Sequence, residues 1–193
     1  LGPDGVVYDD RKSYYMNNPF ADKKPEDIII TFPCYIQPKV NGVRAFLKMV
    51  NGKAKLFSKK GLDYNLPHIT EWFEKNQTLF DMYDDDVIFD GELYIEGEPL
   101  QNIASAVKAY QINTLRVKYH VFDIAIEDMP QDERYAKLYS QESKYKFKVD
   151  NDNEPVVLVP TKKCINDERA QILTDEYITQ GYEGAIFRDM IYS

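Results

Sequence analysis

A lysine between two strand-like segments is the feature that most constrains this chain. Lys39 follows the apolar pair Tyr35-Ile36, and the dipeptide Asn41-Gly42 separates it from a second strand pattern over residues 45–50. Asn-Gly between two apolar runs is a strong β-hairpin signal, so these two strands are predicted to pair. A lysine held by rigid backbone suits a nucleophile, provided that a desolvated pocket or a neighbouring cation removes its proton. Arg44 is a candidate for that cation or for holding a phosphate, although the same pattern is also ordinary surface hairpin sequence.

The composition indicates a globular domain that does not bind nucleic acid by bulk charge. The chain has 193 residues, of which 44% are hydrophobic, and this suits one domain of ordinary size. Its net charge is −8 and its pI is about 4.9, whereas proteins that hold nucleic acid by bulk charge are usually basic. A nucleic-acid role would therefore need a local patch or a further module. Residues 1–24 are polar and turn-rich and are expected to form an irregular lead-in.

The remaining bulk features favour a reduced, intracellular setting, which we take as cytoplasmic. No apolar run approaches the roughly 18 residues of a membrane span, and the N-terminus has no signal-peptide pattern. Cys34 and Cys164 give neither a disulfide framework nor a metal-ligand spacing. Because the first residue is Leu1, the chain is expected to be a fragment or a processed product.

The first half of the chain predicts strands around one helix. A second Asn-Gly pair, Asn51-Gly52, should close a hairpin into a strand over residues 53–58. Helical spacing over residues 66–80 predicts a helix with Trp72 in the core. The triplet Asp84-Asp85-Asp86 resembles a metal cluster but is more typical of a solvated turn.

An acidic strand follows over residues 87–98. Asp90 and Glu92 are two residues apart, so on a strand both point to the same face. Two such carboxylates repel each other unless a metal, a sugar hydroxyl or a lysine lies between them. The alternative is an exposed acidic strand face, and the residues alone leave both readings open.

A strand over residues 115–125 carries two further candidates. His120 is interpreted as a sheet-face residue rather than a metal ligand, and Phe122 is either a core residue or a stacking platform. Three more helices are predicted. The first is over 100–110 with Ile103, Val107 and Tyr110 on one side, the second is a charged helix over 134–143, and the third is over 166–180 with Ile172, Leu173 and Tyr177 inward and Gly181 as its cap. A polar connector over 144–154, a strand over 156–159 and a last strand over 182–188 complete the prediction.

Four short motifs occur in one order, namely Lys39 to Arg44, Phe89 to Glu92, Tyr119 to Asp123, and Glu183-Gly184. In this order and spacing the chain resembles the nucleotidyltransferase (adenylation) domain of ATP-dependent DNA ligases, a superfamily shared with RNA ligases and mRNA capping enzymes. The segments Thr31 to Cys34, Gln101 to Val107 and Gly181-Tyr182 also resemble the small viral and phage DNA ligases, and the resemblance covers roughly residues 19–192.

The resemblance implies an α+β fold, the ATP-grasp-like nucleotidyltransferase domain. Its antiparallel sheets pack face to face with helices outside and ATP in the groove between them. Residues 25–193 would form this adenylation domain, truncated before the family's fifth motif, a Lys-x-Lys strand. A C-terminal OB module is expected in such a ligase but is absent from this chain.

The resemblance also implies the chemistry. Lys39 would attack the α-phosphate of ATP and form lysyl-AMP, and AMP would then pass to the 5′-phosphate of a nick in duplex DNA, which is sealed. The implied contacts are Gln37 to the adenine edge, Phe122 stacked on adenine, Glu92 to the ribose, Arg44 to the sugar or the nick phosphate, Lys59 to a nucleic-acid phosphate, and Glu183 with Asp90 to Mg²⁺.

The chain departs from the family pattern at two motif positions. Asn41 replaces the usual aspartate, and Lys59 stands where ligases often carry arginine, so a phosphate contact there would be a point charge rather than a fork. Two other functions stay open, an RNA ligase or other covalent nucleotidyltransferase of the same fold and a non-catalytic nucleotide-binding or interaction domain. The expected setting is DNA replication or repair, inside the host cell if the protein is viral or from a phage.

Overall fold

The computed structural model describes residues 11–14, 30–76, 87–126, 128–140 and 153–190, and the chain divides into two compact units. Unit 1 comprises residues 1–40, 127–133 and 160–193, and unit 2 comprises residues 41–126 and 134–159. The sequence analysis expected one domain after the lead-in. Each unit combines segments that are distant in sequence, so neither is visible as a continuous stretch.

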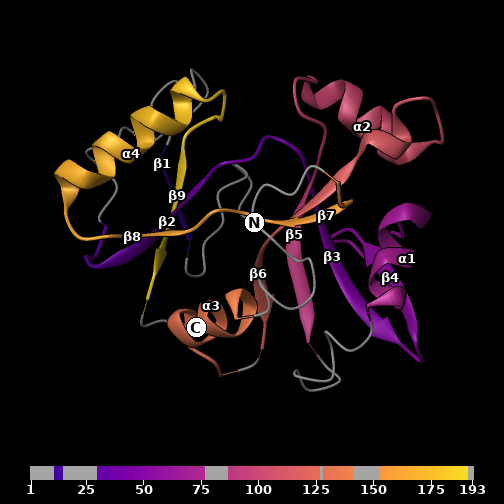
Figure 1. Cartoon of the computed structure of the whole chain (residues 1–193), viewed down its shortest axis with the longest axis horizontal. Coiled ribbons are helices and arrows are strands. Elements are labelled where there is room, and N and C mark those ends of the chain that lie inside the picture. Colours follow the sequence, from indigo (N-terminus) through magenta and orange to yellow (C-terminus); the bar gives the residue numbers. More distant parts are fainter. Residues whose placement is uncertain (1–10, 15–29, 77–86, 127, 141–152, 191–193) are drawn as a thin grey trace. The chain divides into compact units, whose positions relative to one another are not determined.

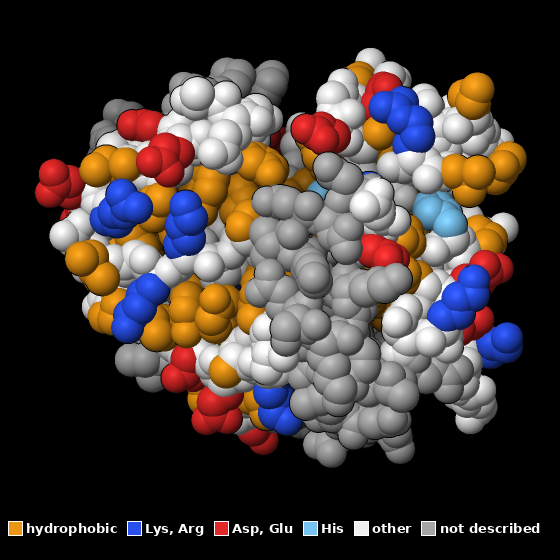
Figure 2. Space-filling view, in the orientation of Figure 1, with side chains coloured by type: hydrophobic (Ala, Val, Ile, Leu, Met, Phe, Trp, Pro, Cys, Tyr) orange, Lys and Arg blue, Asp and Glu red, His pale blue; other side chains and the backbone are white. Residues whose placement is uncertain are grey.

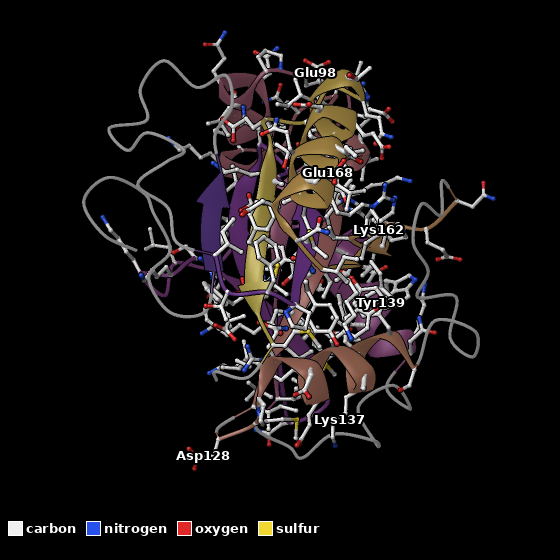
Figure 3. The ribbon with its side chains drawn as sticks, turned by 90° about the vertical axis from the view of Figure 1, so that its left-hand side faces the viewer. Glu98, Asp128, Lys137, Tyr139, Lys162 and Glu168 are labelled. Atoms are coloured by element: carbon white, nitrogen blue, oxygen red, sulfur yellow. The ribbon has the colours of Figure 1, made fainter. Side chains whose placement is uncertain are left out.

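Unit 1 is a four-stranded antiparallel sheet with one long helix, α4. Its strand order is β1 (Arg11–Tyr14), β9 (Ala185–Asp189), β2 (Cys34–Pro38) and β8 (Lys162–Cys164). Helix α4 (Asp167–Thr179, yellow in Figure 1) buries Leu173 and Tyr177 against Ile36 and Phe187 of the sheet. Asn166 caps the helix, since its side chain accepts a hydrogen bond from the Arg169 amide at 2.8 Å, and Glu168 lies in the first turn (Figure 3).

Unit 2 is built on a five-stranded sheet in the order β4 (Lys53–Phe57), β3 (Val43–Val50), β5 (Ile88–Tyr94), β6 (Lys118–Ala125) and β7 (Val156–Leu158). The pairs are antiparallel, except that β7 runs parallel to β6. Helices α1 (Pro67–Lys75) and α2 (Leu100–Lys108) pack on one face of this sheet, and the turn η3 (Thr114–Arg116) leads into β6. Helix α3 (Gln131–Tyr139) places its later residues in unit 2, where the Tyr139 hydroxyl donates to the Val159 carbonyl (Figure 3).

Strand alternation gives the five-stranded sheet of unit 2 an apolar face and a polar face. Ala45, Leu47, Phe89 and Leu93 point to the apolar face and join the core under α1 and α2. We call the opposite surface the polar face. Its residues are Arg44, Phe46 and Lys48 from β3, Lys55 and Phe57 from β4, Asp90 and Glu92 from β5, and His120 and Phe122 from β6.

The hairpin predicted at Asn41-Gly42 is wrong. Strand β2 pairs with β8 and β9, whereas β3 pairs with β4 and β5, so the two strands flanking this dipeptide belong to different sheets. A Cβ added to Gly42 would lie 2.3 Å from the Leu93 carbonyl oxygen, so the glycine here permits a close backbone approach rather than a turn. Asn51 and Gly52 do close the predicted hairpin, with φ values of 51° and 77° that suit a type I′ turn.

Most predicted elements are confirmed, but several details are not. Trp72 is a core residue, whereas Tyr110 is exposed because α2 ends at Lys108, and Ile172 is exposed on α4. The sequence analysis missed β1, within the expected irregular lead-in, and β8, and it started α3 three residues late. The acidic triplet at 84–86 and most of the predicted connector lie outside the described residues.

Charged side chains of both signs are interspersed on the visible face of the molecule (Figure 2). A basic surface therefore has to be identified from the positions of individual residues on the strands. Among the described residues, no helix is both long enough and apolar enough to cross a membrane.

Candidate active site

The backbone of unit 1 places Lys39 directly beside Glu183. Beyond the paired residues Pro38 and Ala185, the ladder between β2 and β9 continues through two further hydrogen bonds. The Lys39 amide donates to the Gly184 carbonyl at 2.9 Å, and the Glu183 amide donates to the Lys39 carbonyl at 3.3 Å. The Lys39 Nζ atom lies 3.0 Å from Glu183 Oε2, with side-chain exposures of 20% and 30%. The candidate nucleophile and the candidate metal ligand are thus held together by one stretch of ladder.

The C-terminal end of α4 determines where the chain places Glu183. The Tyr182 amide donates to the Tyr177 carbonyl and the Gly181 amide to the Ile178 carbonyl, both at 3.0 Å, which is the Schellman pattern of helix termination. Gly181 has a φ of 96°, a value that glycine adopts without strain. The rings of Tyr177 and Tyr182 pack edge to face across the cap. The predicted cap at Gly181 is confirmed, and it turns the chain into the segment that carries Glu183.

Gln37 is buried in unit 1 and is held by side chains on both ends of its amide. Its Nε2 donates to Thr161 Oγ1 at 2.8 Å, and its Oε1 accepts from Arg188 Nε at 2.8 Å. The buried Arg188 also donates to Gln131 Oε1 at 3.0 Å. Gln37 is on β2, which ends one residue before Lys39, so this network fixes the backbone leading to the lysine.

Arg44 and Asp90 form a bidentate ion pair on the polar face of unit 2. Arg44 Nε donates to Asp90 Oδ1 at 3.0 Å, and Arg44 Nη2 donates to Asp90 Oδ2 at 2.6 Å. Burial lowers the pKa of the Arg44 guanidinium, but the hydrogen bond and the charge of Asp90 outweigh it and raise this pKa above its usual value. Both oxygens of Asp90 are engaged by Arg44, so this carboxylate positions the arginine.

Phe122 owes its position to a β-bulge. Asp90 pairs with Asp123 and Gly91 pairs with Val121, so Phe122 is the extra residue on β6. The bulge leaves Phe122 on the polar face, where the Arg44 guanidinium carbon lies 5.8 Å from its ring centroid. Phe122 is only 3% exposed, although it is outside the main hydrophobic core formed by the described residues of unit 2.

A buried ion pair stabilises the bulge from the α3 side. Arg134 Nε lies 3.2 Å from Asp123 Oδ1 and Arg134 Nη2 lies 3.3 Å from Asp123 Oδ2, and both residues are less than 10% exposed. Asp123 Oδ1 also accepts from the Ile124 amide at 2.8 Å. The sequence reasoning missed Arg134, although its spacing from the buried Leu138 places it on the inward side of α3.

The remaining candidates lie in unit 2 around these groups. Glu92 is opposite Arg44 on β3 and opposite His120 on β6, and its Oε2 would be 3.4 Å from a Cβ added to Gly42. His120 faces the sheet surface as expected, and burial together with Lys118 lowers its pKa to about 4. Lys59 is exposed in the turn that follows β4.

Each unit therefore brings together its own set of predicted residues. Unit 1 combines Lys39 and Glu183 near the buried Gln37, and unit 2 combines Arg44 with Asp90 beside Phe122. Lys59 is in the turn that follows the edge strand β4 of unit 2.

The carboxylates present suit a Mg²⁺ ion that is bound together with a nucleotide. Among the described residues, no group of three or more His, Cys, Asp or Glu side chains could hold a metal by itself. Mg²⁺ is commonly bound by one or two carboxylates plus substrate phosphate oxygens. Glu183 offers such a carboxylate, whereas Asp90 would first have to leave Arg44.

The chain is similar to known proteins over most of its length. A family model described as "ATP dependent DNA ligase domain" matches residues 21–192. A DNA ligase of African swine fever virus (isolate Tick/South Africa/Pretoriuskop Pr4/1996) is 31% identical over 160 residues, which are 80% of this chain and 36% of that protein. The chain thus spans about a third of the length of this curated relative.

Solved structures show the same fold. The Chlorella virus DNA ligase-adenylate aligns with a TM-score of 0.61 at 18% identity, over 89% of this chain and 60% of that chain. The ATP-dependent DNA ligase of bacteriophage T7 in complex with ATP aligns with a TM-score of 0.62 at 13% identity, over 83% and 57%. The family match over most of the sequence shows that this chain belongs to the ATP-dependent DNA ligase domain family.

Proposed function

We propose that this chain is the adenylating part of a DNA ligase and that Lys39 carries AMP covalently. The observation that carries the proposal is the ion pair of 3.0 Å between Lys39 Nζ and Glu183, which the ladder between β2 and β9 holds in place. A half-buried lysine fixed by backbone on both sides has the rigidity that a nucleophile needs. The family to which the chain belongs supplies the reaction type.

In the first step, the unprotonated Lys39 amine attacks the α-phosphorus of ATP. A P–N bond forms, the bond from the α-phosphorus to the oxygen bridging to the β-phosphate breaks, and pyrophosphate leaves with that electron pair. The ammonium paired with Glu183 is not nucleophilic, so the ion pair must open and the ammonium must lose its proton to solvent before attack. Mg²⁺ would be held by Glu183 and would neutralise phosphate charge, which is the main requirement of phosphoryl transfer.

Three residues of the polar face of unit 2, Arg44, Glu92 and Phe122, are assigned to the nucleoside. Phe122 would stack on adenine, Glu92 would hydrogen-bond the ribose, and Arg44 would contact the sugar or a phosphate. The contact of 5.8 Å between the Arg44 guanidinium and the Phe122 ring supports this assignment, because it places a cation and an aromatic ring side by side. Gln37 is proposed to act on the adenine edge through its backbone or by rearranging, since both ends of its amide are held by protein side chains.

The later steps pass AMP to the nick. A 5′-phosphate oxygen would attack the α-phosphorus of lysyl-AMP and break the P–N bond, and the 3′-hydroxyl would then attack the 5′-phosphorus with loss of AMP. Nicked duplex DNA is the proposed substrate, because the viral relative is a DNA ligase.

The test is transfer of label from α-³²P-ATP in the presence of Mg²⁺, followed by a denaturing gel and peptide mapping. We expect label on Lys39 and none in Lys39→Ala. The matched control is Lys163→Ala, which removes another lysine from the same sheet, at β8, and should label normally. Glu183→Gln should reduce labelling while leaving the thermal midpoint within a few degrees of the parent.

Absence of label would overturn the proposal if the chain is folded and a longer form of the protein that contains it is not labelled either. A comparison of sealing activity on a nicked DNA duplex and on a nicked RNA duplex then separates a DNA ligase from an RNA ligase. Equal labelling of Lys39→Ala would show that another residue carries AMP.

A further inference from the structure

In one stretch of this acidic chain, every charged side chain is basic. Residues 41–62 contain six basic side chains and no acidic one, although the whole chain has a net charge of −8. Arg44 is already assigned to the ion pair with Asp90, which leaves five lysines with no role in the proposed chemistry. They are Lys48, Lys53, Lys55, Lys59 and Lys60, and we call them the hairpin lysines.

The register of the β3–β4 hairpin gathers two of these lysines on the polar face. Lys48 pairs directly with Lys55, and Phe46 pairs with Phe57, on the face that also carries Arg44. Strand β4 is the edge of the sheet, and Lys59 and Lys60 are exposed in the turn that follows it. The hairpin lysines therefore extend from the polar face to the open edge of unit 2.

This arrangement has an energetic cost in the isolated protein. Like charges directly opposite each other on paired strands are destabilising. Two acids offer only weak compensation, since Lys55 Nζ lies 3.4 Å from Asp63 and Lys53 Nζ lies 3.7 Å from Glu74, with the two lysine side chains 46% and 81% exposed. A polyanion placed against the hairpin would relieve the repulsion.

Two phenylalanine rings lie on the polar face beside Lys48. Phe46 and Phe57 stack with centroids 5.9 Å apart, and Lys48 Nζ lies 5.5 Å from the Phe57 centroid. The two rings are partly exposed, and the Lys48 ammonium group lies over that of Phe57. Ammonium groups act as point charges rather than planar forks, which suits contact with phosphates irrespective of base sequence.

We propose that the hairpin lysines bind the phosphate backbone of duplex DNA. The inference rests on the proposed function for its choice of partner, and it extends the predicted contact of Lys59 to the whole β3–β4 hairpin. Charge complementarity favours DNA as the partner, because a cluster of lysines without acids in an otherwise acidic chain attracts a polyanion. This surface would supply the local basic patch that the bulk charge of the chain does not.

Lysines on an edge strand also discourage pairing between molecules. That role makes a different prediction, since removing the charges would then promote self-association and leave DNA affinity unchanged. The two roles are therefore separable by experiment.

The test measures binding of a nicked DNA duplex to the chain over a range of salt concentrations. In the double variant Lys48→Gln/Lys55→Gln, the slope of log K against log salt should fall by about 2, because each phosphate contact contributes about 0.9. The affinity at low salt should fall about tenfold, as expected for two lost phosphate contacts. Lys108→Gln is the matched control, since this exposed lysine is on α2, which packs on the apolar face of the same sheet.

An unchanged slope and affinity in the double variant would overturn the proposal, and so would an equal loss in Lys108→Gln. Labelling by α-³²P-ATP, measured on the same preparations, should be unaffected by the hairpin substitutions. Because binding is measured without chemistry, a chain that binds as expected but never labels would refute the proposed function alone.

Discussion

Replacing Arg134 with leucine should destabilise unit 2 more than any change at an exposed position of α3. Arg134 and Asp123 are 6% and 8% exposed, and two contacts of 3.2 and 3.3 Å join them. Removing one partner of a buried ion pair typically costs about 3–5 kcal/mol, because the other charge stays buried. Set against a typical unfolding free energy of about 5–15 kcal/mol, this is a large loss.

A double-mutant cycle separates the ion pair from the packing of the side chains. Asp123→Asn alone should also be costly, but it keeps an oxygen that can accept from the Ile124 amide. In the variant that combines both changes, no charge stays buried at this site. The combined cost should therefore be smaller than the sum by about 2–3 kcal/mol.

Urea unfolding followed by tryptophan fluorescence measures this directly in unit 2. Trp72 is the single tryptophan of the chain, it is 7% exposed in the unit 2 core, and its Nε1 donates to Glu154 at 2.8 Å. Lys137→Leu is the matched control on the exposed side of α3 and should change stability by no more than about 0.5 kcal/mol. A cost below about 1 kcal/mol for Arg134→Leu, or strict additivity in the cycle, would refute the reasoning, since a buried pair behaves otherwise.

Two further predictions concern unit 2. Gly42→Ala should cost stability and reduce labelling of Lys39, because its Cβ would lie 2.3 Å from the Leu93 carbonyl oxygen, and normal urea unfolding with normal labelling would contradict this. For His120, a pKa lowered to about 4 means that the unfolded chain takes up a proton that the folded chain does not, between about pH 6.5 and pH 4. Its contribution to stability is therefore complete above about pH 6.5 and is lost progressively as the pH falls towards 4. The urea midpoint should drop from pH 7 to pH 5 by less in His120→Gln than in the parent, and an equal drop would rule out His120 as a cause.

Local sequence was informative where the element is determined by its own residues. Asn51-Gly52 closes a two-residue turn because both residues adopt positive φ, which Asn and Gly tolerate better than other residues do. Gly181 ends α4 for a similar reason, and the apolar spacing of α1 placed Trp72 in the core. Each of these predictions depended only on residues within a few positions of the feature that it predicted.

Local sequence patterns gave wrong predictions where contact with a segment distant in sequence determines the structure. Asn41-Gly42 has the same two residues as the successful hairpin, but β2 and β3 each find other partners, β9 and β5, more than 40 residues away in the chain. Tyr110 and Ile172 were assigned to buried faces by continuing a helical pattern, and both are exposed. Helix ends and partner strands are therefore the places where periodicity alone is weakest.

The sequence by itself indicated the family and the residues that we propose to carry the chemistry, because the motifs are short, local and ordered along the chain. Only the tertiary structure decided how they are held. The ion pair of Lys39 with Glu183 joins segments about 140 residues apart, and the commitment of Asp90 to Arg44 depends on strand register. The position of Phe122 depends on a bulge that the distant Arg134 supports. These contacts depend on pairing between segments far apart in sequence, and no local pattern of residue types records such pairing.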